Sequence, residues 1–268
     1  MLQLRQLADE HDFCLIVDDT IANWQNVDLI STGLADVVCT SLTKLVSGRG
    51  DVLAGSLVVN PNTPKGRWML ADLKQHETKT DLHVADAHAL YENSGDFLER
   101  SEKINETSVR LAEWLSNHTA VKDVYYPTGS KTYESIRANG YGGLLSMIVH
   151  PHMCQRHFYD ELQVAKGPSL GTNFTLVCPY TLLAHYHELD FAMSYGVPPN
   201  LIRVAVGLES FDELQEKFYR ALSKSQLYPK PSLQQVRTLC TSSNSGCRGT
   251  LRTERKSSLL GLSRQLVR

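Results

Sequence analysis

The stretch DVVCTSLTKLVSGRGDVLAGSLVV (36–59) decides the fold of this chain. Two apolar runs, 35–44 and 51–60, flank the turn SGRGD, so each run predicts a strand. A third run, FCLIVD (13–18), ends in an acid and predicts a strand buried on both faces, as in parallel sheets. Because ligands of open α/β sheets bind beyond the carboxyl ends of strands, the residues that end these runs are candidate site residues.

The rest of the chain predicts an alternation of helices and further strands. Leu4, Leu7 and Ala8 lie on one face of an N-terminal helix, and a helix follows Pro61 and Pro64 through about residue 78. The longest helical pattern is 94–118, with Ser94 as its expected N-cap. Later segments predict four strands and two helices: strands at 121–127, 143–150, 173–178 and 201–206, and helices near 153–162 and 211–222.

These elements predict an α/β fold in three parts. Residues 1–93 form part of a large domain with a mostly parallel sheet, and 94–225 form a long connecting helix and a small α+β domain. Residues 226–268 are Ser-rich and basic, with eight Lys and Arg residues against Glu254 alone, and predict a disordered tail. Three strands alone would leave the first sheet poorly covered, which indicates another covering chain or a larger protein.

Composition excludes several classes of protein. The 268 residues contain no apolar run of membrane-spanning length, and the N-terminus lacks the apolar region of a signal peptide. Six cysteines show no CxxC spacing, so we expect a cytoplasmic protein with reduced thiols. The basic tail lacks interleaved aromatic residues and predicts no nucleic-acid partner, although an interaction module remains a third, weaker reading.

Lys44 and Asp18 are the main candidates for catalysis. A partly shielded lysine at a strand end can act as an amine nucleophile toward an aldehyde, although an isolated lysine there usually points to solvent. A carboxylate at the end of a neighbouring strand can hold a pyridinium nitrogen protonated, which is the pairing that pyridoxal 5'-phosphate (PLP) chemistry requires. Ser41 and Thr43 offer hydroxyl donors for a phosphate, whereas Asp19 is interpreted as a helix cap or solvated turn residue.

The two segments CLIVDDT and DVVCTSLTKLVSGRGDVLAGSLVV resemble the Cys/Met-metabolism PLP enzymes, whose pattern is V-D-[NE]-T followed by D-I-V-x-x-S-x-T-K-x-x-x-G-x-x-[DN]-x-x-x-G. The resemblance implies that Asp18 pairs with the pyridinium, that Ser41 and Thr43 bind phosphate, and that Lys44 carries the cofactor. Asp19 stands where the family usually has Asn or Glu.

Two later segments extend the resemblance. SLGTNFTL (169–176) is similar to the family's S-L-G segment near the substrate, which assigns Ser169 to the substrate site. LIRVAVGLES (201–210) is similar to L-[IV]-R-x-[SA]-V-G-[LI]-E, which assigns Arg203 to the substrate's α-carboxylate. Within the family, NSGDFLERSEKINETS and YGGLLSMIV look most like fungal cystathionine γ-synthases.

The resemblance implies the PLP-dependent transferase fold (fold type I) and a transsulfuration activity. The substrates would be an O-acylhomoserine and cysteine, joined by γ-replacement on the route to methionine, in a homo-oligomer (dimer or tetramer). A cystathionine lyase, an O-acetylhomoserine sulfhydrylase and a catalytically inactive fragment remain open alternatives, because no residue decides among them.

The resemblance starts part-way along the family pattern. The family's phosphate-binding glycine loop, its ring-stacking aromatic residue and its inter-subunit Tyr and Arg have no counterpart here, so we expect an N-terminally truncated sequence that is nearly silent alone. The pairs His150-x-His152 and His185-x-His187 suggest no third ligand, and we expect no metal.

Overall fold

The computed structural model describes residues 1–76 and 82–226, which belong to one compact unit. The strands are β1 (Ile16–Asp18), β2 (Val37–Ser41), β3 (Gly55–Val59), β4 (Val121–Tyr125), β5 (Leu144–Val149), β6 (Ala165–Lys166), β7 (Leu176–Cys178) and β8 (Ile202–Ala205). The helices are α1 (Leu2–Glu10), α2 (Pro64–Gln75), α3 (Val84–Asn93), α4 (Phe97–Ser116), α5 (Lys131–Glu134), α6 (Gln155–Glu161), α7 (Tyr180–Ala184), α8 (Leu189–Ser194) and α9 (Phe211–Gln226), with a short 3₁₀ helix at Tyr186–Glu188.

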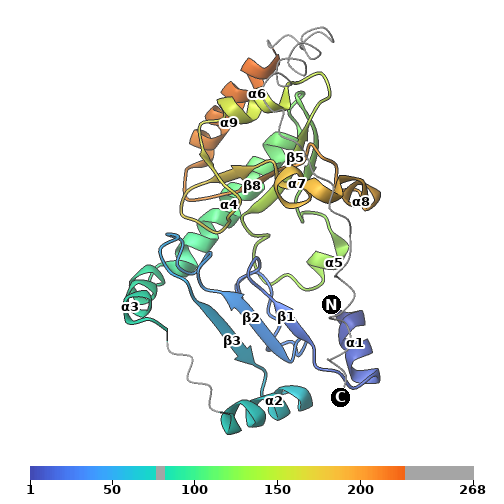
Figure 1. The fold of residues 1–268 in the computed structure, drawn as a ribbon, viewed down its shortest axis with the longest axis vertical. Coiled ribbons are helices and arrows are strands. Elements are labelled where there is room, and N and C mark those ends of the chain that lie inside the picture. The colour runs from blue at the N-terminus through green and yellow to red at the C-terminus, as the bar shows by residue number, and fades with distance from the viewer. Residues whose placement is uncertain (77–81, 227–268) are drawn as a thin grey trace, which may run out of the picture. The chain divides into compact units, whose positions relative to one another are not determined.

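The first sheet has the order β1-β2-β3 (Figure 1). β1 pairs parallel to β2, with Asp18 opposite Cys39, so the carboxyl ends of these two strands meet at one edge of the sheet. β3 pairs antiparallel to β2, with Ser41 opposite Gly55, because the chain reverses direction over residues 42–54. The expected three strands are present, and the sheet they form is mixed.

Burial in this sheet differs from the sequence prediction. β2 is mostly buried, but Ile16 of β1 is 53% exposed, so the prediction that residues 13–18 form a strand buried on both faces is wrong. β1 is an edge strand in the described sheet, with β2 as its neighbour and no strand on its other side. Its side chains therefore lack the cover that an interior strand of a larger sheet would have.

Helix α4 connects the first sheet to the second one (Figure 1). Its buried face includes Ile104, Leu111 and Leu115 at helical spacing, as the sequence pattern predicted. The prediction that Ser94 caps this helix is wrong. Asp96 is the N-cap residue, and Ser94 instead ends α3, a helix that the sequence analysis did not predict.

The second sheet has the order β4-β5-β8-β7-β6 and is antiparallel except for the β6–β7 pair. It forms the largest apolar core of the described residues together with α4, α6 and α9. The largest fully buried side chains of this core include Phe158, Phe218, Met147, Leu145 and Ile202. The α+β character predicted for this part of the chain is confirmed, whereas β6, α5, α7 and α8 were not predicted.

Some expectations stay untested. The tail of residues 226–268 lies almost wholly outside the described residues, and the division between residues 93 and 94 remains a prediction. Among the described helices, none is both long and apolar enough to cross a membrane. Within the same residues, no three His, Cys, Asp or Glu side chains gather as metal ligands.

Candidate active site

The turn after β2 presents Lys44 to a loop that lies 125 residues further along the chain. Lys44 Nζ donates a hydrogen bond to Ser169 Oγ over 3.0 Å. The turn itself is closed by backbone bonds from Lys44 N to Ser41 O and from Gly48 N to Lys44 O. The structure therefore brings two of the predicted site residues together and leaves the Lys44 amine beside a neutral hydroxyl.

Gly171 allows this close approach. Its φ angle is +73°, a backbone conformation that glycine adopts readily and other residues rarely adopt. A Cβ atom at Gly171 would lie 2.6 Å from Leu45 N and 2.9 Å from the Cβ of Lys44. The glycine of the S-L-G segment is thus required because this loop lies directly against the backbone that carries Lys44.

Asp18, at the end of β1, is tied to the end of β2 through Thr20. The Thr20 hydroxyl donates to Asp18 Oδ1 over 2.6 Å and accepts a hydrogen bond from Ser41 N at 3.0 Å. Hydrogen bonds from the Thr20 hydroxyl and backbone N–H lower the pKa of Asp18 below its usual value. The carboxylate is therefore ionised at neutral pH, as a partner for a pyridinium must be. Thr20 was not predicted as a site residue.

Ser41 and Thr43 differ in how free their hydroxyls are. The Thr43 hydroxyl accepts from Ala54 N at 3.0 Å and donates to Ala54 O at 3.2 Å, which closes the β2–β3 turn. A hydroxyl has only one proton to donate, so Thr43 would have to release Ala54 O in order to donate to a phosphate. The Ser41 hydroxyl makes no such bond in the described structure. The assignment of both residues to a phosphate remains a prediction, and the geometry favours Ser41.

Arg203 lies on β8, opposite Cys178 of β7 and Ser146 of β5. Its Nη2 donates to the carbonyl oxygens of Pro168 and Ser169, the latter over 3.0 Å. Ser169 is therefore shared: its hydroxyl accepts from Lys44 and its carbonyl accepts from Arg203. The predicted amine and the predicted carboxylate-binding guanidinium converge on one residue.

Arg100 on α4 is a buried cation that sequence reasoning missed. It donates to Leu45 O at 3.0 Å, to Val46 O at 2.8 Å and to Asn173 Oδ1 at 3.1 Å. It thus joins the Lys44 turn to the loop that carries Ser169. A signal was available, because Arg100 precedes Ile104 by one helical turn and so lies on the apolar face of α4.

Asp19 also departs from its prediction. It is only 4% exposed and accepts a hydrogen bond from Trp24 N at 2.6 Å, so the interpretation as a cap or solvated turn residue is wrong. Burial raises the pKa of Asp19 to about 6, with a further contribution from the nearby Asp18 charge.

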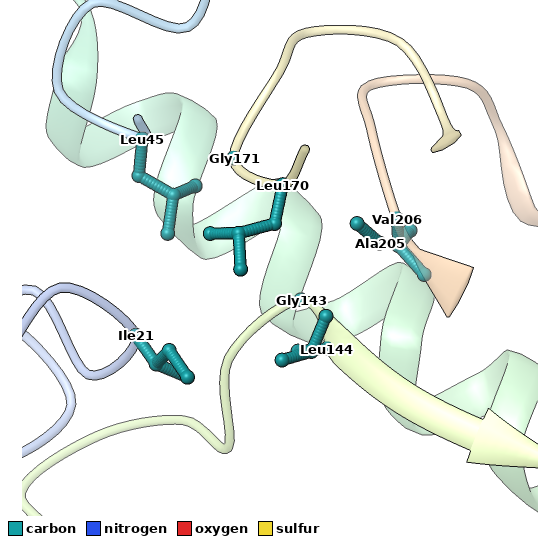
Figure 2. Close-up of a pocket in the computed structure, with 8 residues that line it drawn as sticks. All are labelled: Ile21, Leu45, Gly143, Leu144, Leu170, Gly171, Ala205 and Val206. Carbon is teal, nitrogen blue, oxygen red and sulfur yellow. The ribbon is translucent and has the colours of Figure 1, made fainter. Parts of the chain in front are cut away.

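An apolar pocket lies beside these polar groups. It is lined by Leu45 from the Lys44 turn, by Leu170 and Gly171 from the loop that carries Ser169, and by Ile21 from the turn after β1 (Figure 2). The start of β5 and the end of β8 complete the wall. Leu45 and Leu170 therefore place apolar side chains next to Lys44 and Ser169, which are both half-buried.

Comparison with known proteins identifies the family. The model of the Cys/Met metabolism PLP-dependent enzymes matches residues 1–223, which is most of the chain. The chain therefore belongs to this family of PLP-dependent enzymes. Cystathionine γ-synthase of Neurospora crassa is 40% identical over 231 residues, covering 84% of this chain and 37% of the relative. Cystathionine γ-synthase of Saccharomyces cerevisiae is 40% identical over 235 residues, covering 83% of this chain and 36% of the relative.

Solved structures share the fold. Cystathionine γ-lyase of Lactobacillus plantarum, complexed with L-serine, has a TM-score of 0.73 at 25% identity and covers 84% of this chain and 59% of its own. Cystathionine γ-synthase of Xanthomonas oryzae, in complex with cystathionine, has a TM-score of 0.72 at 22% identity, covering 84% and 59%. These likenesses confirm the predicted fold type. The chain spans about two fifths of the length of the curated relatives that it matches.

The donor set of the site fits PLP. Lys44 would supply an amine for the aldehyde, Asp18 an ionised carboxylate for the ring nitrogen, and Ser41 a hydroxyl for the phosphate. The Asp18–Thr20–Ser41 bridge ties two of these groups together. PLP is the cofactor of the family, and these residues are those of the chain that we expect to hold it.

Proposed function

We propose that this chain carries the γ-replacement activity of a cystathionine γ-synthase, in which cysteine displaces the acyloxy group of an O-acylhomoserine. The observation that carries the proposal is the convergence on Ser169, where the Lys44 amine and the Arg203 guanidinium meet. An amino-acid substrate presents a reacting Cα next to a carboxylate, so it needs a proton-transferring group and a cation that are held by neighbouring parts of the site. The similarity to fungal cystathionine γ-synthases supports the choice of reaction.

Each residue has a distinct part in this proposal. When bound, PLP supplies an electron sink for negative charge at the substrate's Cα. Lys44 binds the cofactor covalently and then moves protons to and from the substrate carbon atoms as general base and acid. Asp18 keeps the proton on the pyridine nitrogen, because its lowered pKa leaves it negatively charged. Arg203 holds the α-carboxylate and so fixes which bond at Cα faces Lys44.

The PLP-loaded protein tests this proposal in one assay with three substrate pairs. We expect cystathionine from O-acetylhomoserine and cysteine to form faster than homocysteine from O-acetylhomoserine and sulfide, or than breakdown products from cystathionine. This ranking does not depend on the absolute rate. A different ranking would indicate a sulfhydrylase or a lyase, and absence of all three products would leave the inactive fragment.

We also propose that the protein assembles as a homo-oligomer, a dimer or a tetramer. The exposed apolar residues of the first sheet support this, since Ile16 and Leu57 are each about half exposed. Sedimentation velocity of the purified chain tests it, and a monomer at all concentrations would contradict it.

A further inference from the structure

Three groups hold Arg203 in the structure: two backbone carbonyls, the Cys178 side chain, which is hydrogen-bonded to it from the neighbouring strand, and an aromatic ring. Carbonyl oxygens of Pro168 and Ser169 accept hydrogen bonds from Nη2 in the plane of the guanidinium. The ring of Tyr180 lies against the guanidinium itself, with 5.0 Å between the Arg203 Cζ and the ring centroid. At this separation a cation is attracted to the electron-rich face of an aromatic ring. The hydrogen bonds fix the guanidinium within its plane, and the ring restricts its tilt out of that plane.

Tyr180 is in turn held by its own neighbours. It is the first residue of α7 and is half-buried, and its ring packs edge-on against the imidazole of His185, with centroids 5.8 Å apart. His185 Nδ1 lies 2.6 Å from Glu188 Oε1. A continuous row of contacts therefore runs from Glu188 through His185 and Tyr180 to Arg203.

The contact with Arg203 uses the ring of Tyr180 and not its hydroxyl. Within the described part of the chain, the Tyr180 hydroxyl makes no hydrogen bond, so phenylalanine would keep every contact that the ring makes. The Tyr180→Phe variant therefore separates the contact between the ring and Arg203 from any requirement for the tyrosine hydroxyl at the start of α7.

We propose that Tyr180 is a positioning residue that fixes the plane of the Arg203 guanidinium for the α-carboxylate of an amino-acid substrate. The carboxylate part of this inference rests on the proposed function, whereas the positioning of Arg203 does not. A planar guanidinium binds a carboxylate best when its N–H groups are already aligned, so a fixed plane favours substrate binding over the chemical step. Nothing in the sequence motifs points to Tyr180.

Nitrogen-15 NMR of the arginine side chains tests the positioning directly. The Nη2–H signal of Arg203, whose protons make these hydrogen bonds, is identified by its loss in Arg203→Lys. In the unsubstituted protein and in Tyr180→Phe, we expect this signal to carry a ring-current shift and to exchange slowly with water. In Tyr180→Leu, we expect the shift to vanish and exchange to become about tenfold faster. Tyr186→Leu is the matched control, because Tyr186 is an exposed tyrosine whose ring contacts His187 and not Arg203.

Titration of the PLP-loaded protein with L-cystathionine tests the second part. We expect the Kd to rise about tenfold in Tyr180→Leu and to stay unchanged in Tyr180→Phe and Tyr186→Leu. An unshifted, rapidly exchanging Arg203 signal in the unsubstituted protein would overturn the positioning role, whether or not Tyr180→Leu folds. A normal Arg203 signal without any response to L-cystathionine would instead contradict the proposed function and the carboxylate role that rests on it.

Discussion

Lys44 Nζ and Ser169 Oγ lie 3.0 Å apart, although they belong to segments separated by 125 residues. Lys44 follows β2 of the first sheet, and Ser169 lies in the loop before β7 of the second sheet. The contact is possible because Gly171 lets the loop touch the backbone at Lys44, and because Arg100 binds both segments. The contact between Lys44 and Ser169 therefore depends on the packing between the turn after β2 and the loop before β7.

Gly171→Ala should separate the Lys44 turn from the loop that carries Ser169. The added Cβ would approach Leu45 N to 2.6 Å and would also strain a φ of +73°. We expect a loss of about 2–3 kcal/mol in the free energy of urea unfolding. Gly196→Ala is the control, because Gly196 has a φ of +79° with nothing within 4 Å and so isolates the backbone strain. Equal losses in both variants would show that the close approach has no energetic role.

Arg100→Ala should lower the free energy of unfolding more than Arg110→Ala, the substitution of the exposed arginine on the same helix. The substitution leaves the carbonyl oxygens of Leu45 and Val46 without their donor in a buried site. We expect a loss of about 2–4 kcal/mol in urea unfolding, and little rescue by lysine, which lacks the planar fork of donors. Arg110→Ala is the matched control on the same helix, with a side chain that is 50% exposed against 6% for Arg100. A loss in Arg110→Ala equal to that in Arg100→Ala would contradict this role.

Asp19 should make the protein less stable as pH rises. Its folded pKa of about 6 lies above the value of 3.8 for a free carboxyl, so the folded state binds the proton more tightly than the unfolded state does. Its unfavourable contribution therefore grows from about pH 4 to pH 6 and is constant above that, reaching on the order of 3 kcal/mol. Asp19→Asn keeps an acceptor for Trp24 N and removes the titration. Urea unfolding at about pH 4 and pH 7 should show the variant gaining stability relative to the parent, and a constant difference would refute the raised pKa.

Asp18→Asn should preserve the fold and remove most of the activity. The amide can still accept from Thr20 but carries no negative charge to keep the cofactor's ring nitrogen protonated. We expect turnover to fall on the order of 10²-fold, while the protein still unfolds cooperatively on heating. Steady-state assay and thermal melting of the PLP-loaded protein measure both, and near-normal turnover in this variant would refute the pyridinium role.

The sequence predicted those features that depend on local pattern. Asp18 and Lys44 were found because each ends an apolar run, and strand ends of this type meet at one edge of a sheet. Ser169 and Arg203 came from the resemblance, since neither has a local pattern that marks it. Arg100, Thr20 and Tyr180 were missed because their contacts cross between segments. The misreading of Asp19 has the same origin: a turn acid looks solvated until the packing around it is known.

Reductive trapping of the bound cofactor tests the covalent attachment of PLP at Lys44 directly. The purified chain is incubated with excess PLP, reduced with borohydride to fix the cofactor on its amine, digested and mapped by mass spectrometry. We predict that the pyridoxyl label lies on Lys44, and that Lys44→Ala loses both the label and the visible absorption of the bound cofactor. Label on another lysine, or visible absorption that persists in Lys44→Ala, would contradict the assignment of Lys44 as the cofactor-binding lysine.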